Sequence, residues 1–98
     1  MKNNSKPVGF ITGVTGQDGA YLADLLLRRG YDVYGGFRRG GTNKVWRLDY
    51  LGITKRIKLV EFQLNEPQNL IEILQTIQPD EIYHLAGESM VAPMAPKV

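Results

Sequence analysis

Three glycines spaced three residues apart constrain this chain more than any other feature. Gly13, Gly16 and Gly19 follow an apolar run over residues 8–12 and precede an amphipathic stretch over about residues 20–29. A buried strand, a glycine turn and a helix in this order can hold a diphosphate, because the small residues permit a tight turn, close approach of the backbone and close helix packing. The N–H groups at the helix start then face the phosphates. A glycine triplet alone also fits an ordinary turn, but the flanking strand and helix favour a dinucleotide site.

Strands and helices alternate along the whole chain. The expected strands cover residues 8–12, 31–37, 58–62 and 81–85, and the expected helices cover about residues 20–29, 45–51 and 65–77. Such alternation predicts an α/β fold with parallel strands joined by right-handed crossovers. The expected fold class is therefore a Rossmann-type parallel sheet with flanking helices, and about four of its strands are expected within residues 1–98.

Residue types at the helix ends support these bounds. Gly30 can end the first long helix, and Asn65 can cap the last one, with Pro67 in its first turn. Apolar residues at helical spacing predict the face that each helix turns toward the sheet. In the first helix they are Leu22, Leu25 and Leu26, and in the last helix they are Leu70, Ile71, Leu74 and Ile77.

The charge balance and the absence of cysteine exclude several classes of function. The 98 residues contain 12 basic and 10 acidic side chains, a net charge of +2, without a basic face that would suit nucleic acid. No apolar run approaches the roughly 18 residues of a membrane span, so we expect no membrane partner. A chain without cysteine forms no disulfides or thiolate metal sites, and we expect a cytoplasmic protein without a bound metal. The polar residues 1–6 do not resemble a signal peptide.

The end of the second expected strand indicates which dinucleotide is bound. Proteins that prefer NAD usually place Asp or Glu there, to hold the ribose 2′-hydroxyl. Here Gly35 and Gly36 are followed by Phe37, Arg38 and Arg39, without an acid. A guanidinium can bind a 2′-phosphate through two hydrogen bonds and stack on adenine, whereas a carboxylate would repel the phosphate. The position favours NADP as the cofactor over the alternative of a solvated basic loop.

These residues resemble a known family. The run TGVTGQDG over residues 12–19, with YLADLLLRRGYDVYG after it, is similar to the extended short-chain dehydrogenases/reductases and, more narrowly, to the GDP-mannose 4,6-dehydratase family. The ending Gln17-Asp18-Gly19 is unusual in the superfamily and typical of this dehydratase family. The family's other motifs match at Arg38-Arg39, at residues 45–48 and 51–53, at residues 79–83 and at Leu85-Ala86. The resemblance covers about residues 8–91.

The resemblance implies a redox-neutral lyase that uses NADP. In the family, hydride leaves C4 of the sugar of GDP-mannose, water is lost across C5 and C6, and hydride returns to C6 to give GDP-4-keto-6-deoxymannose. Arg38 would then meet the 2′-phosphate and adenine. By motif position, the residues that would meet the pyrophosphate and ribose are Gly13, Thr15, Gly16, Gln17 and Asp18. The remaining expected cofactor-binding residues are Gln63, Leu64, Leu85, Ala86 and Ser89.

The same resemblance implies a homo-oligomer. In the family, the loop after the double arginine reaches the cofactor of a neighbouring subunit, so residues 39–47 are expected to form a tetramer contact. Trp46 fits either such a contact or internal packing. Asp18 also fits a carboxylate that complements the helix dipole, and Ser89 also fits an ordinary loop serine. His84, the single histidine, fits a hydrogen-bonded structural role better than a cofactor-lining one.

The chain departs from the family pattern at two positions. Gln63 stands where the family has an Asp that accepts a hydrogen bond from adenine N6, and its amide oxygen can accept that bond without charge assistance. Glu88 stands where the family has Gln, which puts a carboxylate near the cofactor and the substrate. These departures leave the nucleotide sugar open, so another nucleotide-sugar epimerase or reductase of the superfamily is the alternative.

The catalytic half of the superfamily pattern is missing from residues 1–98. The chemistry rests on Tyr-x-x-x-Lys, and none of the five tyrosines has a lysine four residues on. We therefore assign no catalytic residue and expect an N-terminal NADP-binding portion, inactive alone, of a chain whose Tyr-Lys segment and substrate lobe lie elsewhere. A sheet that stops at its fourth strand would expose the edge over residues 82–85. The alternative from another class is a non-catalytic NADP-binding module.

Overall fold

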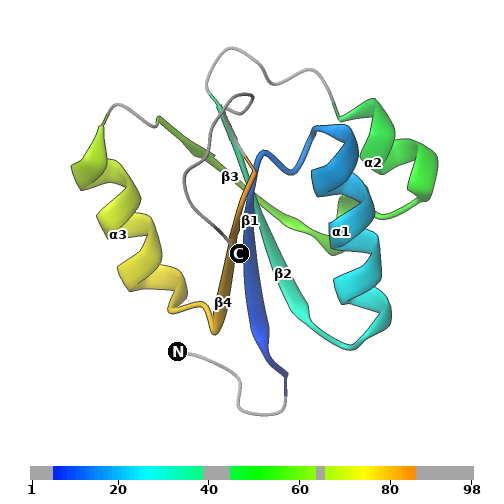
Figure 1. Ribbon diagram of the computed structural model, residues 1–98, viewed down its shortest axis with the longest axis horizontal. Coiled ribbons are helices and arrows are strands. Elements are labelled where there is room, and N and C mark those ends of the chain that lie inside the picture. The colour runs from blue at the N-terminus through cyan, green and yellow to red at the C-terminus, as the bar shows by residue number, and fades with distance from the viewer. Residues whose placement is uncertain (1–5, 39–44, 64–65, 86–98) are drawn as a thin grey trace.

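Four parallel strands form the centre of the protein (Figure 1). The computed structural model describes residues 6–38, 45–63 and 66–85. The strands are β1 (Val8–Thr12), β2 (Asp32–Arg38), β3 (Lys58–Phe62) and β4 (Glu81–His84), and the helices are α1 (Gln17–Arg28), α2 (Trp46–Leu51), the 3-10 helix η1 (Thr54–Arg56) and α3 (Pro67–Ile77). None of the helices in these ranges is long and apolar enough to cross a membrane. The predicted alternation of strands and helices is confirmed.

The strand order β3-β2-β1-β4 places β1 in the interior of the sheet. Its parallel register runs from Val8 opposite Asp32 to Thr12 opposite Gly36 on one side, and from Gly9 opposite Glu81 to Thr12 opposite His84 on the other. All five residues of β1 are buried. A strand covered on both sides needs apolar or small residues at every position, and that is why the run reads VGFIT without alternation.

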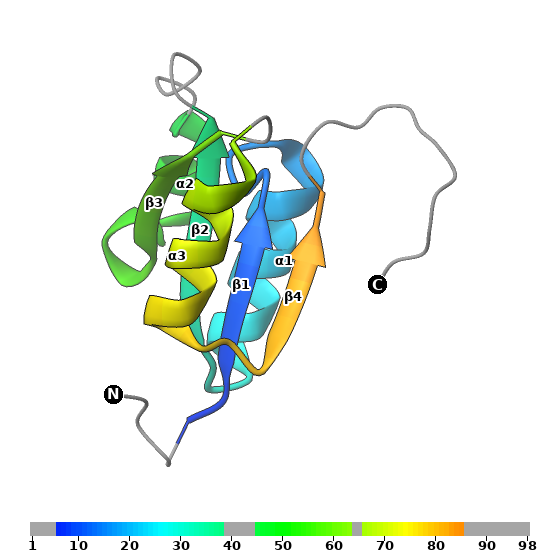
Figure 2. The same ribbon diagram turned by 90° about the vertical axis from the view of Figure 1, so that its left-hand side faces the viewer.

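Helices cover both faces of the sheet, α1 and α2 one face and α3 the other (Figure 2). On the face of α1 and α2, alternate strand residues Ile11 and Val33 pack in one buried cluster with apolar residues of both helices. Phe10 and Phe62 are buried on the opposite face, where their rings lie beside the backbone of Gly36. The core is therefore two thin layers, one on each side of β1 and β2.

Several predicted bounds were wrong by one to three residues. Helix α1 begins at Gln17 and not at Ala20, because Gly16 is its N-cap and the Gly16 carbonyl accepts the Ala20 N–H at 2.9 Å. Strand β2 begins and ends one residue later than expected, helix α2 begins one residue later, and β4 ends one residue earlier. The N-cap of α3 is Glu66, whereas the predicted cap Asn65 lies outside the described residues. Helix η1 was not predicted.

The predicted inward face of α3 is only partly buried. Leu70, Leu74 and Ile77 are half-buried, and Ile71 is 45% exposed. In the described part of the chain α3 is the only helix on its face of the sheet, so no neighbouring helix covers its flank. Strand β4 is likewise the last strand of the described sheet, and Ile82 on it is 47% exposed, which confirms the predicted exposed edge.

Candidate functional site

The glycine turn joins β1 to α1 and is anchored on the end of β2. The N–H groups of Gly13 and Val14 both donate to the Gly36 carbonyl, at 2.9 and 3.2 Å, and the Gly16 N–H donates back to the Gly13 carbonyl at 3.1 Å. Gly13 has φ of 78°, in the left-handed region that favours glycine. Gly13 is therefore the glycine of the three that permits the tight turn.

The other two glycines of the turn have different surroundings. A Cβ on Gly19 would lie 2.2 Å from the Gly13 carbonyl oxygen and 2.8 Å from Cα of Val14, so α1 rests directly on the backbone of the turn. A Cβ on Gly16 would meet nothing closer than 3.5 Å, and this residue is exposed. Of the three glycines, Gly19 thus serves helix packing, while the helix start at Gly16 would accept a Cβ without a clash.

The start of α1 offers backbone donors to a ligand. Its first helical hydrogen bond runs from the Ala20 N–H, so the preceding N–H groups of Gln17, Asp18 and Gly19 have no carbonyl one turn earlier in the helix. Among the described residues no side chain caps this end. Gln17 and Asp18 are exposed and Thr15 is half-buried. Donors at the positive end of a helix dipole form an anion site, and Asp18 fits both this site and a simple dipole contact.

Gly35 and Gly36 in β2 have a packing role that the sequence interpretation missed. A Cβ on Gly35 would lie 2.6 Å from Cγ1 of Val14, and a Cβ on Gly36 would lie 2.9 Å from the Phe62 ring. Two consecutive glycines inside a strand are themselves a signal of close approach by another group. They let the turn and Phe62 pack directly onto the sheet.

The predicted residues Arg38, Gln63 and Leu85 lie at the same edge of the sheet as the turn, because the carboxyl ends of parallel strands meet there. Arg38 is exposed at the end of β2 and pairs in register with Phe62, which Gln63 follows. The Gln63 N–H donates to Oδ1 of Asn69 at 3.2 Å. The Leu85 N–H, just beyond β4, donates to the carbonyl and to Oγ1 of Thr12 at 3.1 and 3.0 Å.

His84 joins β4 to β1 at this edge. Its Nδ1 lies 2.8 Å from Oγ1 of Thr12, a residue that is 1% exposed. The Leu85 N–H donates to the same oxygen, so the Thr12 hydroxyl contacts two consecutive residues at the end of β4. The predicted hydrogen bond of His84 is confirmed, and the choice between a structural and a cofactor-lining role stays a prediction.

Other predicted site residues lie outside the described part of the chain. These are Leu64, Ala86 and Ser89, and of the predicted contact segment 39–47 only residues 45–47 are described. No group of three acidic or histidine side chains in the described ranges is arranged to hold a metal ion.

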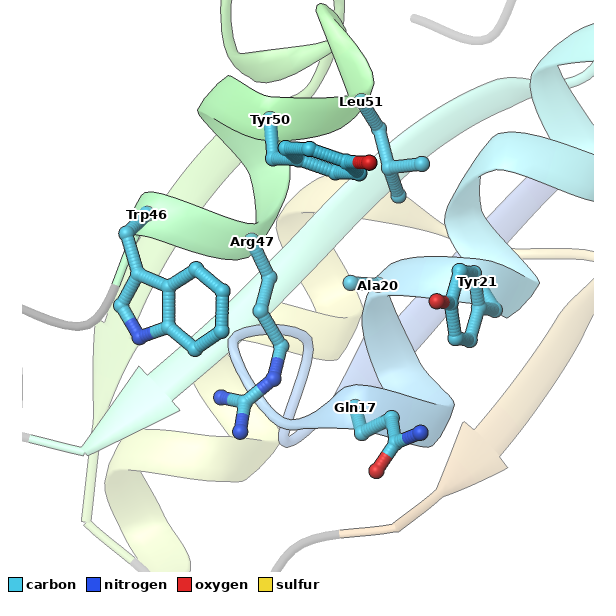
Figure 3. A pocket seen from close by; sticks show the side chains of 7 residues that line it. All are labelled: Gln17, Ala20, Tyr21, Trp46, Arg47, Tyr50 and Leu51. Atoms are coloured by element: carbon cyan, nitrogen blue, oxygen red, sulfur yellow. The ribbon is translucent and has the colours of Figure 1, made fainter.

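A contact of Arg47 with the turn was not predicted. Nη1 of Arg47, on α2, donates to the Thr15 carbonyl at 3.2 Å, and its guanidinium lies 4.5 Å from the centre of the Trp46 ring. Arg47 and Trp46 border an open pocket of about 220 Å³ between α1 and α2 (Figure 3). The pocket is lined by Gln17, Ala20, Tyr21, Trp46, Arg47, Tyr50 and Leu51. A contact across 32 residues has no local sequence signal.

Tyr31, the residue before β2, and Tyr83 of β4 are unsuited to act as a base. Tyr31 and Tyr83 both donate their hydroxyls to the carboxylate of Glu81. The hydrogen bond to Glu81, with some burial, raises the pKa of Tyr83 to about 12, and the pKa of Tyr31 is raised for the same reasons. A tyrosine that exchanges protons near neutral pH needs a lowered pKa. Glu81, on β4, therefore has a structural role: its hydrogen bond to Tyr31 connects β4 to the segment that follows α1.

Comparison with known proteins places this geometry in a family. Residues 10–95 match the model of the family described as GDP-mannose 4,6 dehydratase. The chain is 43% identical to the GDP-mannose 4,6-dehydratase of Vibrio cholerae, over 90% of this chain and 25% of the relative. It is 42% identical to the enzyme of that name from Yersinia enterocolitica, over 85% of this chain and 24% of the relative. The chain thus spans about a quarter of the length of these relatives.

Solved structures share the fold. The Bordetella bronchiseptica enzyme WbmH, in complex with NAD+, superposes with a TM-score of 0.70 at 28% identity, over 86% of this chain and 27% of that one. The parallel sheet with its glycine turn is therefore the Rossmann-type fold expected from the sequence. With the family model matched from Phe10 onward over nearly the whole chain, this protein belongs to the GDP-mannose 4,6-dehydratase family.

Proposed function

We propose that this chain is the NADP-binding part of a GDP-mannose 4,6-dehydratase, a lyase that converts GDP-mannose to GDP-4-keto-6-deoxymannose. The family match and the names of the relatives support the activity and the substrate. Because the chain spans about a quarter of those relatives, the Tyr-Lys pair and the substrate lobe are assigned to a longer chain. The 98 residues alone are expected to be inactive.

The glycine turn is the observation that carries the proposal. Gly16 leaves space at the start of α1, where a Cβ would have its nearest neighbour at 3.5 Å, and the N–H groups of Gln17 and Asp18 begin the helix there. A cofactor diphosphate needs open space, backbone donors and a positive helix end, and this turn has all three. The residues present therefore fit the diphosphate of a dinucleotide.

The choice of NADP over NAD rests on Arg38. It is exposed at the carboxyl end of β2, next to the turn. The residue before it, Phe37, is not acidic. A guanidinium at this position favours a 2′-phosphate. The Bordetella bronchiseptica enzyme is in complex with NAD+, so the preference has to be measured for this chain.

When bound, the nicotinamide ring accepts and returns a hydride. The residues of this chain bind and orient the cofactor. Gln63 would accept from adenine through its amide oxygen, and Leu85, held by two hydrogen bonds to Thr12, would line the site at the end of β4. Leu64, Ala86 and Ser89 stay predictions from the family motif, as do a cytoplasmic location and a tetramer contact through residues 39–47.

The cofactor preference is tested with Arg38→Glu. We expect the ratio of the dissociation constants for NAD+ and NADP+, measured by calorimetry, to move toward NAD+ by at least about tenfold, because a charge-assisted bond is lost and a repulsive charge added. Arg56→Glu is the matched control, since Arg56 is an exposed arginine of η1 at the other end of β3. An unchanged ratio in Arg38→Glu contradicts the assignment of NADP.

The activity is tested with GDP-mannose. The chain of 98 residues with NADP+ is expected to form no 4-keto-6-deoxy product, and product formation would overturn the assignment of the catalytic residues to another segment. A native reading frame that continues past Val98 and yields this product supports the dehydratase. A native chain that ends at Val98 and binds NADP+ without turnover would favour the non-catalytic module.

A further inference from the structure

We infer that Arg47 is a positioning residue for the cofactor: it holds the Thr15 carbonyl toward α2, so that the glycine turn keeps its free N–H groups directed at the diphosphate. The inference rests on the proposed function for the identity of the ligand. It goes beyond that function because Arg47 lies on α2, outside the glycine turn that it orients.

The contact itself joins two elements far apart in the chain. Nη1 of Arg47 lies 3.2 Å from the Thr15 carbonyl oxygen, in a partly buried position, across 32 residues of sequence. In Figure 3 the Arg47 side chain extends from α2 toward the start of α1, and its guanidinium lies between Trp46 and Gln17. Helix α2 is thus fastened to the turn through this side chain.

The bond fixes a whole peptide unit, because the C=O of Thr15 and the N–H of Gly16 belong to one planar group. The oxygen accepts from Arg47, while the Gly16 N–H donates to the Gly13 carbonyl at 3.1 Å. Held at both ends, this peptide cannot rotate. The Gly16 N–H is used inside the turn, and Gly19 is buried, so the exposed residues that offer N–H groups to a diphosphate are Gln17 and Asp18, whose direction follows from this peptide.

Trp46 holds the guanidinium in place. Its ring centre lies 4.5 Å from Cζ of Arg47, a cation–π contact, although 59% of the Trp46 side chain is exposed. In the described ranges no carboxylate pairs with Arg47. Within the described residues the positive charge is therefore not paired with a carboxylate, and it would add to the positive end of α1 on the side proposed to bind the phosphates.

The test uses Arg47→Met, which removes the charge and the donors but retains an unbranched apolar stem. We expect the dissociation constant for NADP+ to rise about tenfold, as loss of a bond from a charged group implies. Binding of adenosine 2′-monophosphate, which lacks the diphosphate, should stay unchanged. The matched control Arg56→Met removes the same charge from η1 and should change neither constant.

A second measurement does not depend on the cofactor. Amide hydrogen exchange of Gly16, followed by NMR without ligand, should quicken about tenfold in Arg47→Met, while exchange of Phe10 and Ile11 inside β1 stays as in the wild type. The inference is overturned if Gly16 exchange is unchanged in Arg47→Met. It is also overturned if the dissociation constants of NADP+ and adenosine 2′-monophosphate rise by the same factor, or if Arg56→Met has the same effect as Arg47→Met. If the wild-type chain fails to bind NADP+, the proposed function fails, and Gly16 exchange still decides the role of Arg47.

Discussion

The substitution Gly19→Ala tests how closely α1 rests on the glycine turn. Alanine is the better helix former, by about 1 kcal/mol in an exposed helix interior, so helix propensity alone predicts a more stable protein. The structure predicts the opposite. The new Cβ would lie 2.2 Å from the Gly13 carbonyl oxygen and 2.8 Å from Cα of Val14, and both are backbone atoms that cannot rotate away.

The expected cost follows from that distance. Ordinary van der Waals contact begins at 3.4 Å, so the separation from the Gly13 oxygen would have to grow by about 1.2 Å. Displacing a packed helix by this much strains the turn and opens the contacts of Ala20 and Ala23 with the core. Overpacking of this kind costs about 1–3 kcal/mol, and at this short distance it exceeds the gain in helix propensity. We expect a net loss of about 2 kcal/mol in the free energy of unfolding.

Urea unfolding followed by circular dichroism measures this loss directly. For a domain of this size about 2 kcal/mol corresponds to a decrease of roughly 10 °C in Tm. Gly16→Ala is the matched control, because its Cβ has no neighbour closer than 3.5 Å. It should lose less than about 1 kcal/mol, the difference between glycine and alanine at an N-cap, and weaken NADP+ binding instead. A Gly19→Ala protein as stable as the wild type would refute the close packing of α1 on the turn.

The remaining predictions concern the strand that supports the turn and the tyrosines of the opposite end. Gly35→Ala should cost about 2 kcal/mol, because its Cβ would lie 2.6 Å from Cγ1 of Val14, and adding Val14→Ala should restore part of that loss in a double-mutant cycle followed by urea unfolding. The hydrogen bond to Glu81 holds the pKa of Tyr83 at about 12 in the folded protein, above its usual value of about 10, so its stabilisation is complete below pH 10 and is lost as the pH rises toward 12. The fall in unfolding free energy over that window should be smaller in Tyr83→Phe, and an equal fall in both proteins would contradict the role of the Glu81 bond.

The strands could be predicted from the sequence because their pattern is local. A run such as VGFIT, apolar at every position, fits a strand covered on both faces, and Lys58–Phe62 was predicted with its exact bounds. The start of α1 was placed three residues late because Gln17 and Asp18 are polar and Gly19 is a poor helix former. Tertiary packing decided that boundary, because Gly19 packs against the backbone of Gly13 and Val14 in the turn.

Site residues could be predicted where they belong to one local motif, but not where elements distant in the sequence come into contact. Gly13, Gly16 and Gly19 follow one another at fixed spacing, so the three roles of such a turn could be predicted, but the structure was needed to show which glycine has which role. The contact between Arg47 and Thr15 depends on how α2 packs beside α1, which no local pattern encodes.

The glycines near the turn fall into two groups with different roles. Gly19 and Gly35 lack side chains because the backbone of the turn and the Val14 side chain occupy the space, so their substitution should lower stability first. Gly16 is exposed, and a Cβ on it would meet nothing closer than 3.5 Å. Packing therefore does not explain the glycine at this helix start, and another reason is needed. The proposed function supplies that reason, because a diphosphate would approach the backbone closely at this position. Stability measurements and cofactor affinities should therefore separate these glycines, which the sequence motif alone treats as equivalent.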